Sequence, residues 1–230
     1  MSAAPRRAAI LLALALSAVV LLRGPCAPRP TRVVLVGDSI TVGIVSEPKG
    51  PSYAELLAQQ LGHGFQIVNV ACGGSSTLDW QPDARPALCP GVPGWIPLYA
   101  TRARPALPAD IATILLGTND MRGALEQAPI EPAAYQAALR ALATALHADG
   151  AREVLLISPP FSLGGVVRLA GYRPRIRELC QELRFVTCGP DLVEVLHGDD
   201  FAPGDVHPNA SGHAKIADAL AAALRELESR

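Results

Sequence analysis

The chain has 230 residues, half of which are hydrophobic, and a formal net charge of −1. This length and composition favour a single globular domain with one sizeable hydrophobic core. No run of basic residues accompanies the near-neutral charge, so the composition excludes nucleic acids and anionic membrane surfaces from the expected partners.

The N-terminal segment has the pattern of an export signal. Arg6 and Arg7 precede an uncharged, apolar stretch over residues 8–22, and Arg23 follows it. A membrane-spanning helix needs roughly 20 apolar residues, and this stretch is shorter. We therefore favour a signal peptide, with an uncleaved membrane anchor formed by residues 8–22 as the alternative.

The chain accordingly divides into three parts. Residues 1–26 form the signal peptide or N-terminal anchor, residues 27–31 a Pro-rich linker, and residues 32–230 the exported domain. The expected location is outside the cytoplasm, either secreted or periplasmic, with membrane anchoring if the first part is retained.

The first strand pattern follows the linker directly. Residues 33–36 are apolar and mostly β-branched, and they lead into Gly37, Asp38 and Ser39. This pattern is typical of a buried parallel strand that ends in a tight turn. Such a turn places Ser39 at the carboxyl edge of a sheet, where open α/β sheets bind their substrates. Serine is common in turns for backbone reasons alone, so its role depends on the rest of the chain.

Helix and strand patterns then alternate. Helices are predicted from Ser52 to Gly62, Pro132 to Gly150, about Pro174 to Leu183, and from Pro208 through Leu227, and further strands over residues 65–70, 111–116, 154–157 and 185–187. This alternation predicts parallel pairing through right-handed crossovers, and hence a three-layer α/β/α sandwich. Residues 75–108 are rich in Pro and Gly without a sustained period, which predicts either the wall of a cleft or a surface loop.

The exported part contains two near pairs of cysteines, Cys72 with Cys89 and Cys180 with Cys188. An even number of cysteines in an exported chain predicts two local disulfides. Four buried free thiols are the alternative. The cysteine and histidine spacings are not those of a metal site, so we expect no metal and no other cofactor.

Several residues at predicted strand ends and helix entries suit one reaction. Ser39 supplies a hydroxyl nucleophile, and His207 supplies an imidazole base in the turn before the last helix. Such a base needs a carboxylate to orient it, and Asp205 is the nearest candidate. The backbone N–H groups of Ser39 and Gly74 and the side-chain amide of Asn119 are candidate donors to an oxyanion.

These motifs together resemble the SGNH (GDSL-type) hydrolase family. Residues 37–40, Gly74, residues 117–120 and residues 207–209 are similar to its four sequence blocks, and the resemblance extends from residue 32 to about residue 228. It implies a flavodoxin-like sandwich with strand order 2-1-3-4-5 and a metal-independent serine esterase or acylhydrolase.

The acid departs from the family pattern. The family usually places an aspartate three residues before the histidine, where this chain has Gly204, and Asp205 lies only two residues before it. This spacing is similar to that of some relatives, including alginate-type O-acetyltransferases. Asp199 and Asp200 are the alternatives to Asp205, and we expect Asp38 to support the turn under Ser39.

We therefore expect an exported serine esterase or acylhydrolase that cleaves ester or thioester bonds through an acyl-enzyme on Ser39. The substrate would be a small-molecule, lipid or carbohydrate ester. A carbohydrate O-acetyltransferase or deacetylase using the same site is the alternative, and an inactive binding domain is the alternative of another class.

The remaining histidines are expected at the surface or in packing: His63, His147, His197 and His213.

Overall fold

The computed structural model describes residues 29–122, 128–160 and 166–230. The predicted signal peptide or anchor, residues 1–26, lies outside the described residues. None of the described helices is both long and apolar enough to span a bilayer.

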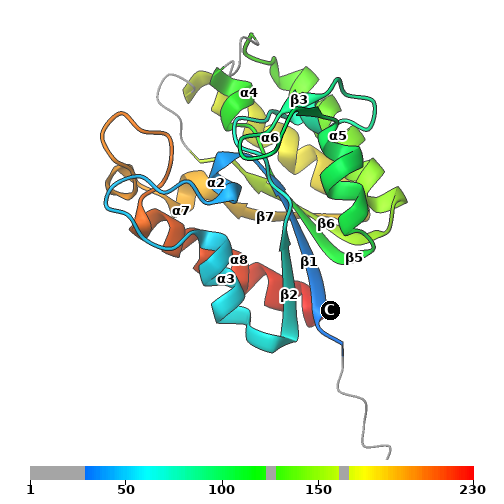
Figure 1. Cartoon of the computed structure of the whole chain (residues 1–230), viewed down its shortest axis with the longest axis horizontal. Coiled ribbons are helices and arrows are strands. Elements are labelled where there is room, and N and C mark those ends of the chain that lie inside the picture. The colour runs from blue at the N-terminus through cyan, green and yellow to red at the C-terminus, as the bar shows by residue number, and fades with distance from the viewer. Residues whose placement is uncertain (1–28, 123–127, 161–165) are drawn as a thin grey trace, which may run out of the picture.

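A five-stranded parallel sheet forms the centre of the described chain (Figure 1). Its strands are β1 (Thr31–Gly37), β2 (Phe65–Asn69), β5 (Ala109–Leu115), β6 (Ala151–Ser158) and β7 (Val186–Asp191). They are arranged in the order β2-β1-β5-β6-β7, and every neighbouring pair is parallel. Counted along the chain, this is the predicted order 2-1-3-4-5, so the predicted topology is confirmed.

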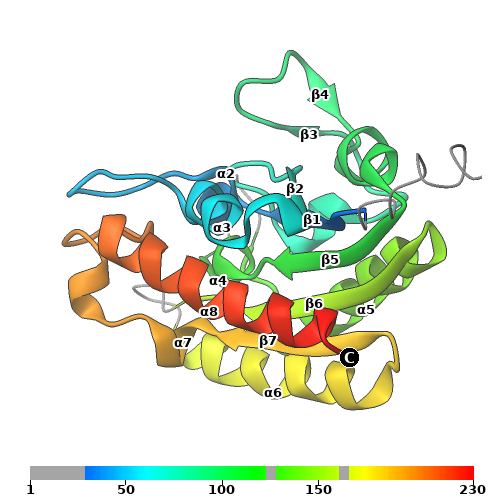
Figure 2. The same ribbon diagram turned by 90° about the horizontal axis from the view of Figure 1, so that it is seen from below.

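Helices cover both faces of the sheet (Figure 2). One face carries α3 (Tyr53–Leu61), α7 (Leu192–Val195) and α8 (Ala210–Glu228), and the other carries α5 (Pro132–Ala148) and α6 (Val166–Glu182). Two short helices, α2 (Ser39–Val42) and α4 (Thr118–Arg122), begin near the carboxyl ends of β1 and β5. The predicted three-layer sandwich is therefore confirmed.

The central strand β1 shows why the apolar runs are continuous. Val33 and Leu35 belong to the hydrophobic cluster on the face of α3 and α8, whereas Val34 and Val36 belong to the cluster on the opposite face, which includes α5 and α6. Successive side chains of a strand point to opposite faces, and here both faces are covered by helices. All four side chains are fully buried as a result.

Two predicted boundaries near the edge strand are wrong. Helix α6 begins at Val166 and contains Pro174 in its interior, whereas the sequence predicted a start near that proline. The burial of Leu169 and Tyr172 in the core compensates for the hydrogen bond that Pro174 lacks. Strand β7 extends to Asp191 through a Gly-Pro pair, which an edge strand tolerates.

The predicted start of the last helix at Pro208 is also wrong. Helix α8 begins at Ala210, and Asn209 caps it by accepting a hydrogen bond from the Gly212 N–H at 3.1 Å. Asparagine is among the strongest N-cap residues. Pro208 lies outside the helix, in an antiparallel bridge with Phe201.

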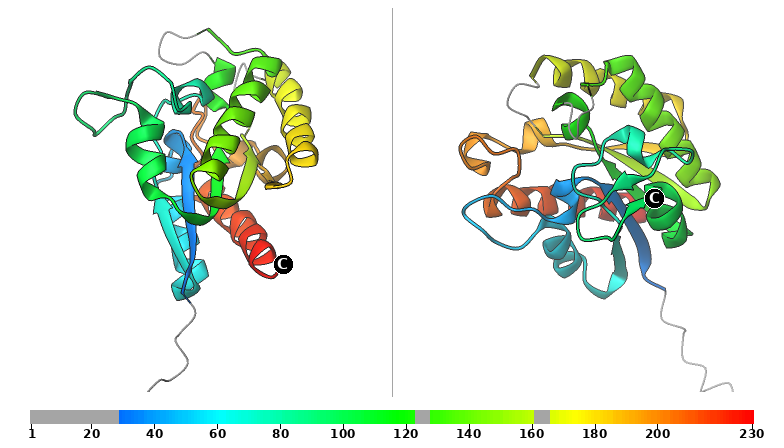
Figure 3. Two further views of the ribbon diagram at one scale, coloured as in Figure 1. Left: turned by 90° about the vertical axis from the view of Figure 1, so that its right-hand side faces the viewer. Right: turned by 45° about the horizontal axis from the view of Figure 1, so that its top comes forward.

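The irregular segment over residues 75–108 contains several short elements (Figure 3). These are the 3₁₀ turn Thr77–Trp80, a hairpin of β3 (Ala87–Leu88) and β4 (Trp95–Ile96), a π-helical turn Tyr99–Ala103 and a 3₁₀ turn Arg104–Ala106. Trp80 and Tyr99 are buried and anchor the segment, whereas Trp95 is 71% exposed. The hairpin projects from the body of the domain (Figure 3).

Both predicted disulfides are present. Cys72–Cys89 joins the loop after β2 to the β3–β4 hairpin, and Cys180–Cys188 joins α6 to β7, with Cα–Cα separations of 5.4 and 5.5 Å. Disulfides persist in oxidising compartments. The two bridges are therefore consistent with an extracellular protein.

Candidate active site

Ser39 lies at the junction of β1 and α2, where the strand pattern predicts it. Asp38 caps α2, because its Oδ1 accepts a hydrogen bond from the Ile40 N–H at 3.0 Å. Gly37 leaves no room for a side chain, since a Cβ at this position would clash with the side chain of Thr41. The turn thus holds the partly exposed Ser39 at the carboxyl edge of the sheet.

His207 reaches Ser39 from the loop that precedes α8. Its Nε2 lies 2.9 Å from the Ser39 Oγ, and its Nδ1 lies 2.8 Å from the Asp205 Oδ1. A ring that donates from Nδ1 to the carboxylate leaves Nε2 free to accept the serine proton. The structure therefore places Ser39, His207 and Asp205 in one hydrogen-bonded line.

The Asp205 carboxylate is held by its own turn. Gly204 adopts a positive φ of 77°, and the Oδ1 of Asp205 accepts hydrogen bonds from the N–H groups of Val206 and His207 at 2.7 and 3.0 Å. Burial alone would raise the pKa of Asp205, but the hydrogen bonds from His207 and Val206 and the charge interaction with His207 together outweigh it and lower the pKa. The glycine turn thus lets an acid only two residues away reach the imidazole.

The two alternative acids lie elsewhere. The buried Asp200 carboxylate accepts hydrogen bonds from the Lys215 Nζ at 2.8 Å and from the Ser211 Oγ at 3.0 Å. Asp199 is exposed, and its backbone carbonyl accepts a hydrogen bond from the side-chain amide of Asn209. Asp200 therefore fastens the loop to α8.

Gly74 lies in the loop after β2, and Asn119 lies in the neighbouring helix α4, which follows β5. Gly74 has a positive φ of 79° in the loop after β2, which suits glycine. The Asn119 Nδ2 donates to the Ser75 carbonyl at 2.9 Å, and its contact with the Asp38 Oδ2 is longer, at 3.5 Å. The amide group of Asn119 is thus hydrogen-bonded to the Ser75 carbonyl, and its contact with the Asp38 carboxyl group is only a long one.

Two buried carboxyl groups, those of Asp38 and Asp120, lie at the carboxyl edge of the sheet near Ser39. Burial raises the pKa of Asp38 to about 7, and it raises the pKa of Asp120 to about 6. The charge of Asp120 raises the pKa of Asp38 further. Asp120 accepts hydrogen bonds from both the N–H and the hydroxyl of Thr77. It therefore links α4 to the loop that carries Gly74.

Sequence reasoning missed the residues that support this loop. Asp120 follows Asn119 directly in one motif, which was its only signal, but its partner Thr77 lies 43 residues earlier. Arg102 also escaped notice, and its guanidinium donates to the carbonyls of Val70 and Ala71 at 2.7 and 3.1 Å. These contacts fix the backbone on either side of the glycine loop.

The other histidines lie in packing or at the surface, as predicted. His213 is buried, accepts a hydrogen bond from the Tyr53 N–H at 3.0 Å, and has a pKa lowered by burial. His147 stacks on Phe185, with ring centroids 4.1 Å apart. Within the described ranges, no group of three or more His, Cys, Asp and Glu side chains is arranged to hold a metal ion.

Comparisons with solved structures agree on the fold. The chain is 21% identical to a carbohydrate esterase of family 2 with a carbohydrate-binding domain from Corynascus thermopiles (Myceliophthora fergusii), with a TM-score of 0.63 over 90% of this chain and 69% of that one. It is 16% identical to an acetyl esterase mutant with an acetate ion, with a TM-score of 0.66 over 86% and 98%.

A further structure is a family two carbohydrate esterase from Clostridium thermocellum in complex with cellohexaose. It is 18% identical, with a TM-score of 0.60 over 89% of this chain and 67% of that one. No curated protein matches the sequence. The model of the GDSL-like lipase/acylhydrolase family matches residues 35–215, which is most of the chain. The chain therefore belongs to the GDSL-like lipase/acylhydrolase family.

Proposed function

We propose that the protein is a serine carboxylic-ester hydrolase that works through an acyl-enzyme on Ser39. The observation that carries this proposal is the hydrogen-bonded line from the Ser39 Oγ through the His207 ring to the Asp205 carboxylate. A serine with an oriented imidazole base attacks acyl carbonyls.

In the first half-reaction, the Ser39 Oγ attacks the carbonyl carbon while His207 Nε2 takes the hydroxyl proton. Asp205 stabilises the imidazolium that forms and keeps the proton on Nδ1. His207 then protonates the departing alkoxide or thiolate, which leaves the acyl group on Ser39. In the second half-reaction, His207 takes a proton from water, the resulting hydroxide attacks the acyl-enzyme, and the acid is released as His207 returns the proton to Ser39.

The negative charge on the carbonyl oxygen needs donors on the other side of Ser39. We assign this role to the backbone N–H groups of Ser39 and Gly74 and to the side-chain amide of Asn119. The position of Asn119 supports the assignment, because its side-chain amide contacts the Ser75 carbonyl and the carboxyl group of Asp38, the residue before Ser39.

Carbohydrate esters are the substrate class that we favour within this activity. Two structures of similar fold are carbohydrate esterases, one of them in complex with cellohexaose, and another is an acetyl esterase with acetate. Transfer of the acyl group to a sugar hydroxyl in place of water is the second candidate. The aligned Ser39 and His207 argue against an inactive binding domain. The predicted export signal and the two disulfides support action outside the cytoplasm.

The test is hydrolysis of p-nitrophenyl acetate and octanoate by the native chain, Ser39→Ala and His207→Ala. Each single change should lower turnover by about 10⁴ to 10⁶, and the double variant should lose little more, because the two residues act as one unit. Rapid acid quenching and mass spectrometry should detect an acetyl group on Ser39. Either variant keeping more than a tenth of native turnover contradicts the mechanism, and product analysis with a sugar acceptor distinguishes transfer from hydrolysis.

A further inference from the structure

Exposed apolar surface is concentrated at the edge of the sheet that carries Ser39. In the part of the chain that the structure describes, the exposed large hydrophobic residues are Val42, Ile44, Leu78, Leu88 and Trp95. All of them belong to segments that follow the carboxyl ends of β1 and β2. Exposed apolar side chains gathered in one region indicate an interaction site.

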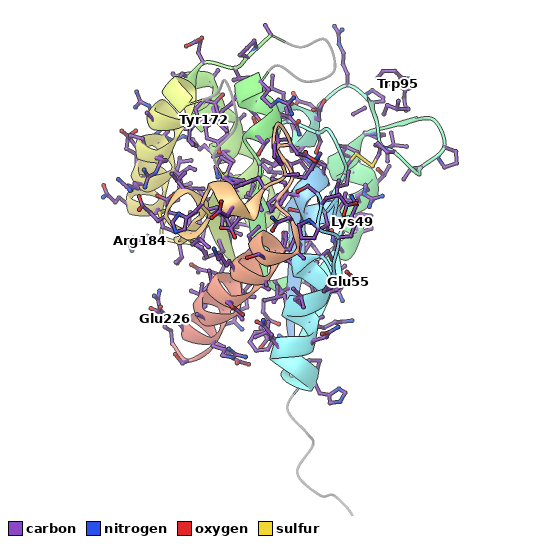
Figure 4. The ribbon with its side chains drawn as sticks, turned by 90° about the vertical axis from the view of Figure 1, so that its left-hand side faces the viewer. Lys49, Glu55, Trp95, Tyr172, Arg184 and Glu226 are labelled. Atoms are coloured by element: carbon purple, nitrogen blue, oxygen red, sulfur yellow. A yellow bond between two sulfur atoms is a disulfide. The ribbon has the colours of Figure 1, made fainter. Side chains whose placement is uncertain are left out.

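Leu88 and Trp95 form the most exposed part of this surface. They are directly opposite each other in the β3–β4 ladder, so their side chains point to the same side of the hairpin. Leu88 is 47% exposed and Trp95 is 71% exposed. The neighbouring pair, Ala87 and Ile96, packs on the core from the other side. Figure 4 shows the Trp95 ring outside the ribbon of the hairpin. We call Leu88 and Trp95 the hairpin face.

The hairpin face begins beside the proposed nucleophile. Cys89, next to Leu88, is bonded to Cys72 in the loop that leads to Gly73. A Cβ added to Gly73 would lie 3.7 Å from the Pro90 Cγ and 3.9 Å from the Ser39 Cβ, so Pro90 and Ser39 both lie next to this glycine. A long substrate with its ester at Ser39 can therefore extend over Pro90 toward the hairpin face.

The hairpin is held in place before any ligand arrives. The disulfide fixes Cys89, the Val92 N–H donates to the Cys89 carbonyl at 3.0 Å, and Val92 itself packs against the core. A surface that is already ordered loses little conformational entropy when it binds a ligand. The backbone that carries the exposed indole is therefore ordered before binding.

The charge of the hairpin indicates which class of ligand its exposed face suits. Residues 81–98 carry one acid, Asp83, and one base, Arg85, so the hairpin has no excess of positive charge for an anionic lipid surface. An uncharged ligand suits a hairpin whose positive and negative charges are equal in number. The face of an indole ring is electron-rich and attracts the C–H groups on one side of a pyranose ring.

We propose that the hairpin face binds the sugar rings of an uncharged O-acylated polysaccharide, whose acyl group is transferred to Ser39. This inference rests on the proposed esterase function. It assigns Trp95 and Leu88 to recognition of the alcohol half of the ester, and it leaves the acyl half to the Ser39 site.

Kinetics on two substrates tests the inference. Trp95→Ala should raise KM for acetylated xylan about tenfold, Leu88→Ala should raise it less, and Trp95→Phe should retain most of the affinity. All three should leave kcat/KM for p-nitrophenyl acetate within about twofold of native, because this small ester does not reach the hairpin. Val42→Ala is the matched control, since Val42 is also 47% exposed but lies outside the hairpin. An unchanged KM for acetylated xylan in Trp95→Ala, or an equal loss on both substrates, overturns the proposal.

A binding experiment separates this proposal from the esterase function. The chain has two tryptophans, and Trp80 is fully buried, so a change in indole fluorescence on titration reports Trp95. Xylohexaose added to Ser39→Ala should shift the emission to the blue with saturation, and Trp95→Phe in the same background should abolish that signal. No shift overturns the proposal, as does a shift with phosphatidylcholine vesicles but not with xylohexaose. Failure of native p-nitrophenyl acetate hydrolysis would instead remove the proposed function, and the titration would still decide whether the face binds sugars.

Discussion

The two edges of the sheet hold buried aspartates in opposite electrostatic states. At the amino edge, Asp110 receives two hydrogen bonds from the Arg29 guanidinium, at 2.6 and 2.7 Å, and one from Arg152 at 3.2 Å. These contacts, led by those of Arg29, lower the pKa of Asp110 to about 2. At the carboxyl edge, burial raises the pKa of Asp38 to about 7 and that of Asp120 to about 6.

This difference indicates how the two edges divide their tasks. A carboxylate paired with arginines stabilises the fold at neutral pH. A buried carboxyl group with a raised pKa lowers the stability of the fold at neutral pH, and such groups are common at functional sites. Substitutions of the carboxyl-edge residues that take part in the proposed chemistry should therefore change activity more than stability, and substitutions at the amino edge should do the reverse.

The largest expected contrast concerns two acids in the same loop. Asp205→Asn should lower kcat by about 10⁴, because an amide in contact with Nδ1 favours the wrong imidazole tautomer, as in the serine proteases where this change is known. Asp200→Asn should keep native kcat and lose about 1–3 kcal/mol of stability, because it leaves Lys215 without its buried partner. Turnover and urea unfolding of both variants check this prediction.

The opposite pattern would reassign the acid. If Asp200→Asn were inactive and Asp205→Asn active, the loop would rearrange in solution. If both variants stayed active, together with Asp199→Asn, a backbone carbonyl would orient His207 and the site would be a serine–histidine dyad.

A smaller loss of activity is expected from Asn119. Asn119→Ala removes one donor from the proposed oxyanion site, so kcat should fall by about 10² to 10³ with little change in KM. Asn69→Ala is the control, because it removes an amide at the end of β2 that donates to the Thr41 carbonyl and takes no part in the proposed chemistry. A change confined to KM would make Asn119 a substrate-binding residue.

The first strand and its turn could be predicted from the sequence because their causes are local. The apolar run of β1 needs only burial on both faces, and the turn needs Gly37 and a capping Asp38 close by. The cysteine pairs are also close in sequence, and so are Asp205 and His207, whose contact depends on one glycine turn.

The residues that escaped prediction act over long separations or through competing local preferences. The partners Thr77 and Asp120 lie 43 residues apart, and no pattern in either segment indicates the contact. Pro208 suits both a helix start and an extended bridge, and the Asn209 cap decides between them. The raised pKa of Asp38 depends on how deeply the folded chain buries it, which the sequence alone does not state.

Asp38 should make native stability depend on pH in a defined direction. The pKa of Asp38 is about 7 in the folded chain and near the ordinary 3.8 in the unfolded chain. Between these values the folded state holds a proton that the unfolded state has lost, so native stability falls as pH rises through this range. Asp38→Asn cannot ionise, and its stability relative to native should rise by about 2–3 kcal/mol from pH 5 to pH 8. Urea unfolding at both pH values measures this change. A constant difference would place the Asp38 pKa near its ordinary value.

The smallest expected effect, with the opposite pH dependence, belongs to the amino edge. Asp110→Asn should lower stability by about 1–2 kcal/mol at pH 7 and leave kcat unchanged, since Arg29 and Arg152 are largely exposed and water weakens their pairing. Asp83→Asn is the control, because it removes the same charge from an exposed position.

Acid should remove this advantage of native Asp110. Its folded pKa of about 2 lies below the unfolded value of 3.8, so the stabilisation is fully present above about pH 4 and is lost as pH falls toward 2. The difference between the native chain and Asp110→Asn should therefore shrink by about half between pH 7 and pH 3, whereas the Asp38→Asn difference changes mainly between about pH 4 and pH 7 and in the opposite direction. If both variants responded to pH in the same range and direction, the two edges would share one electrostatic environment, and the division of tasks between them would be wrong.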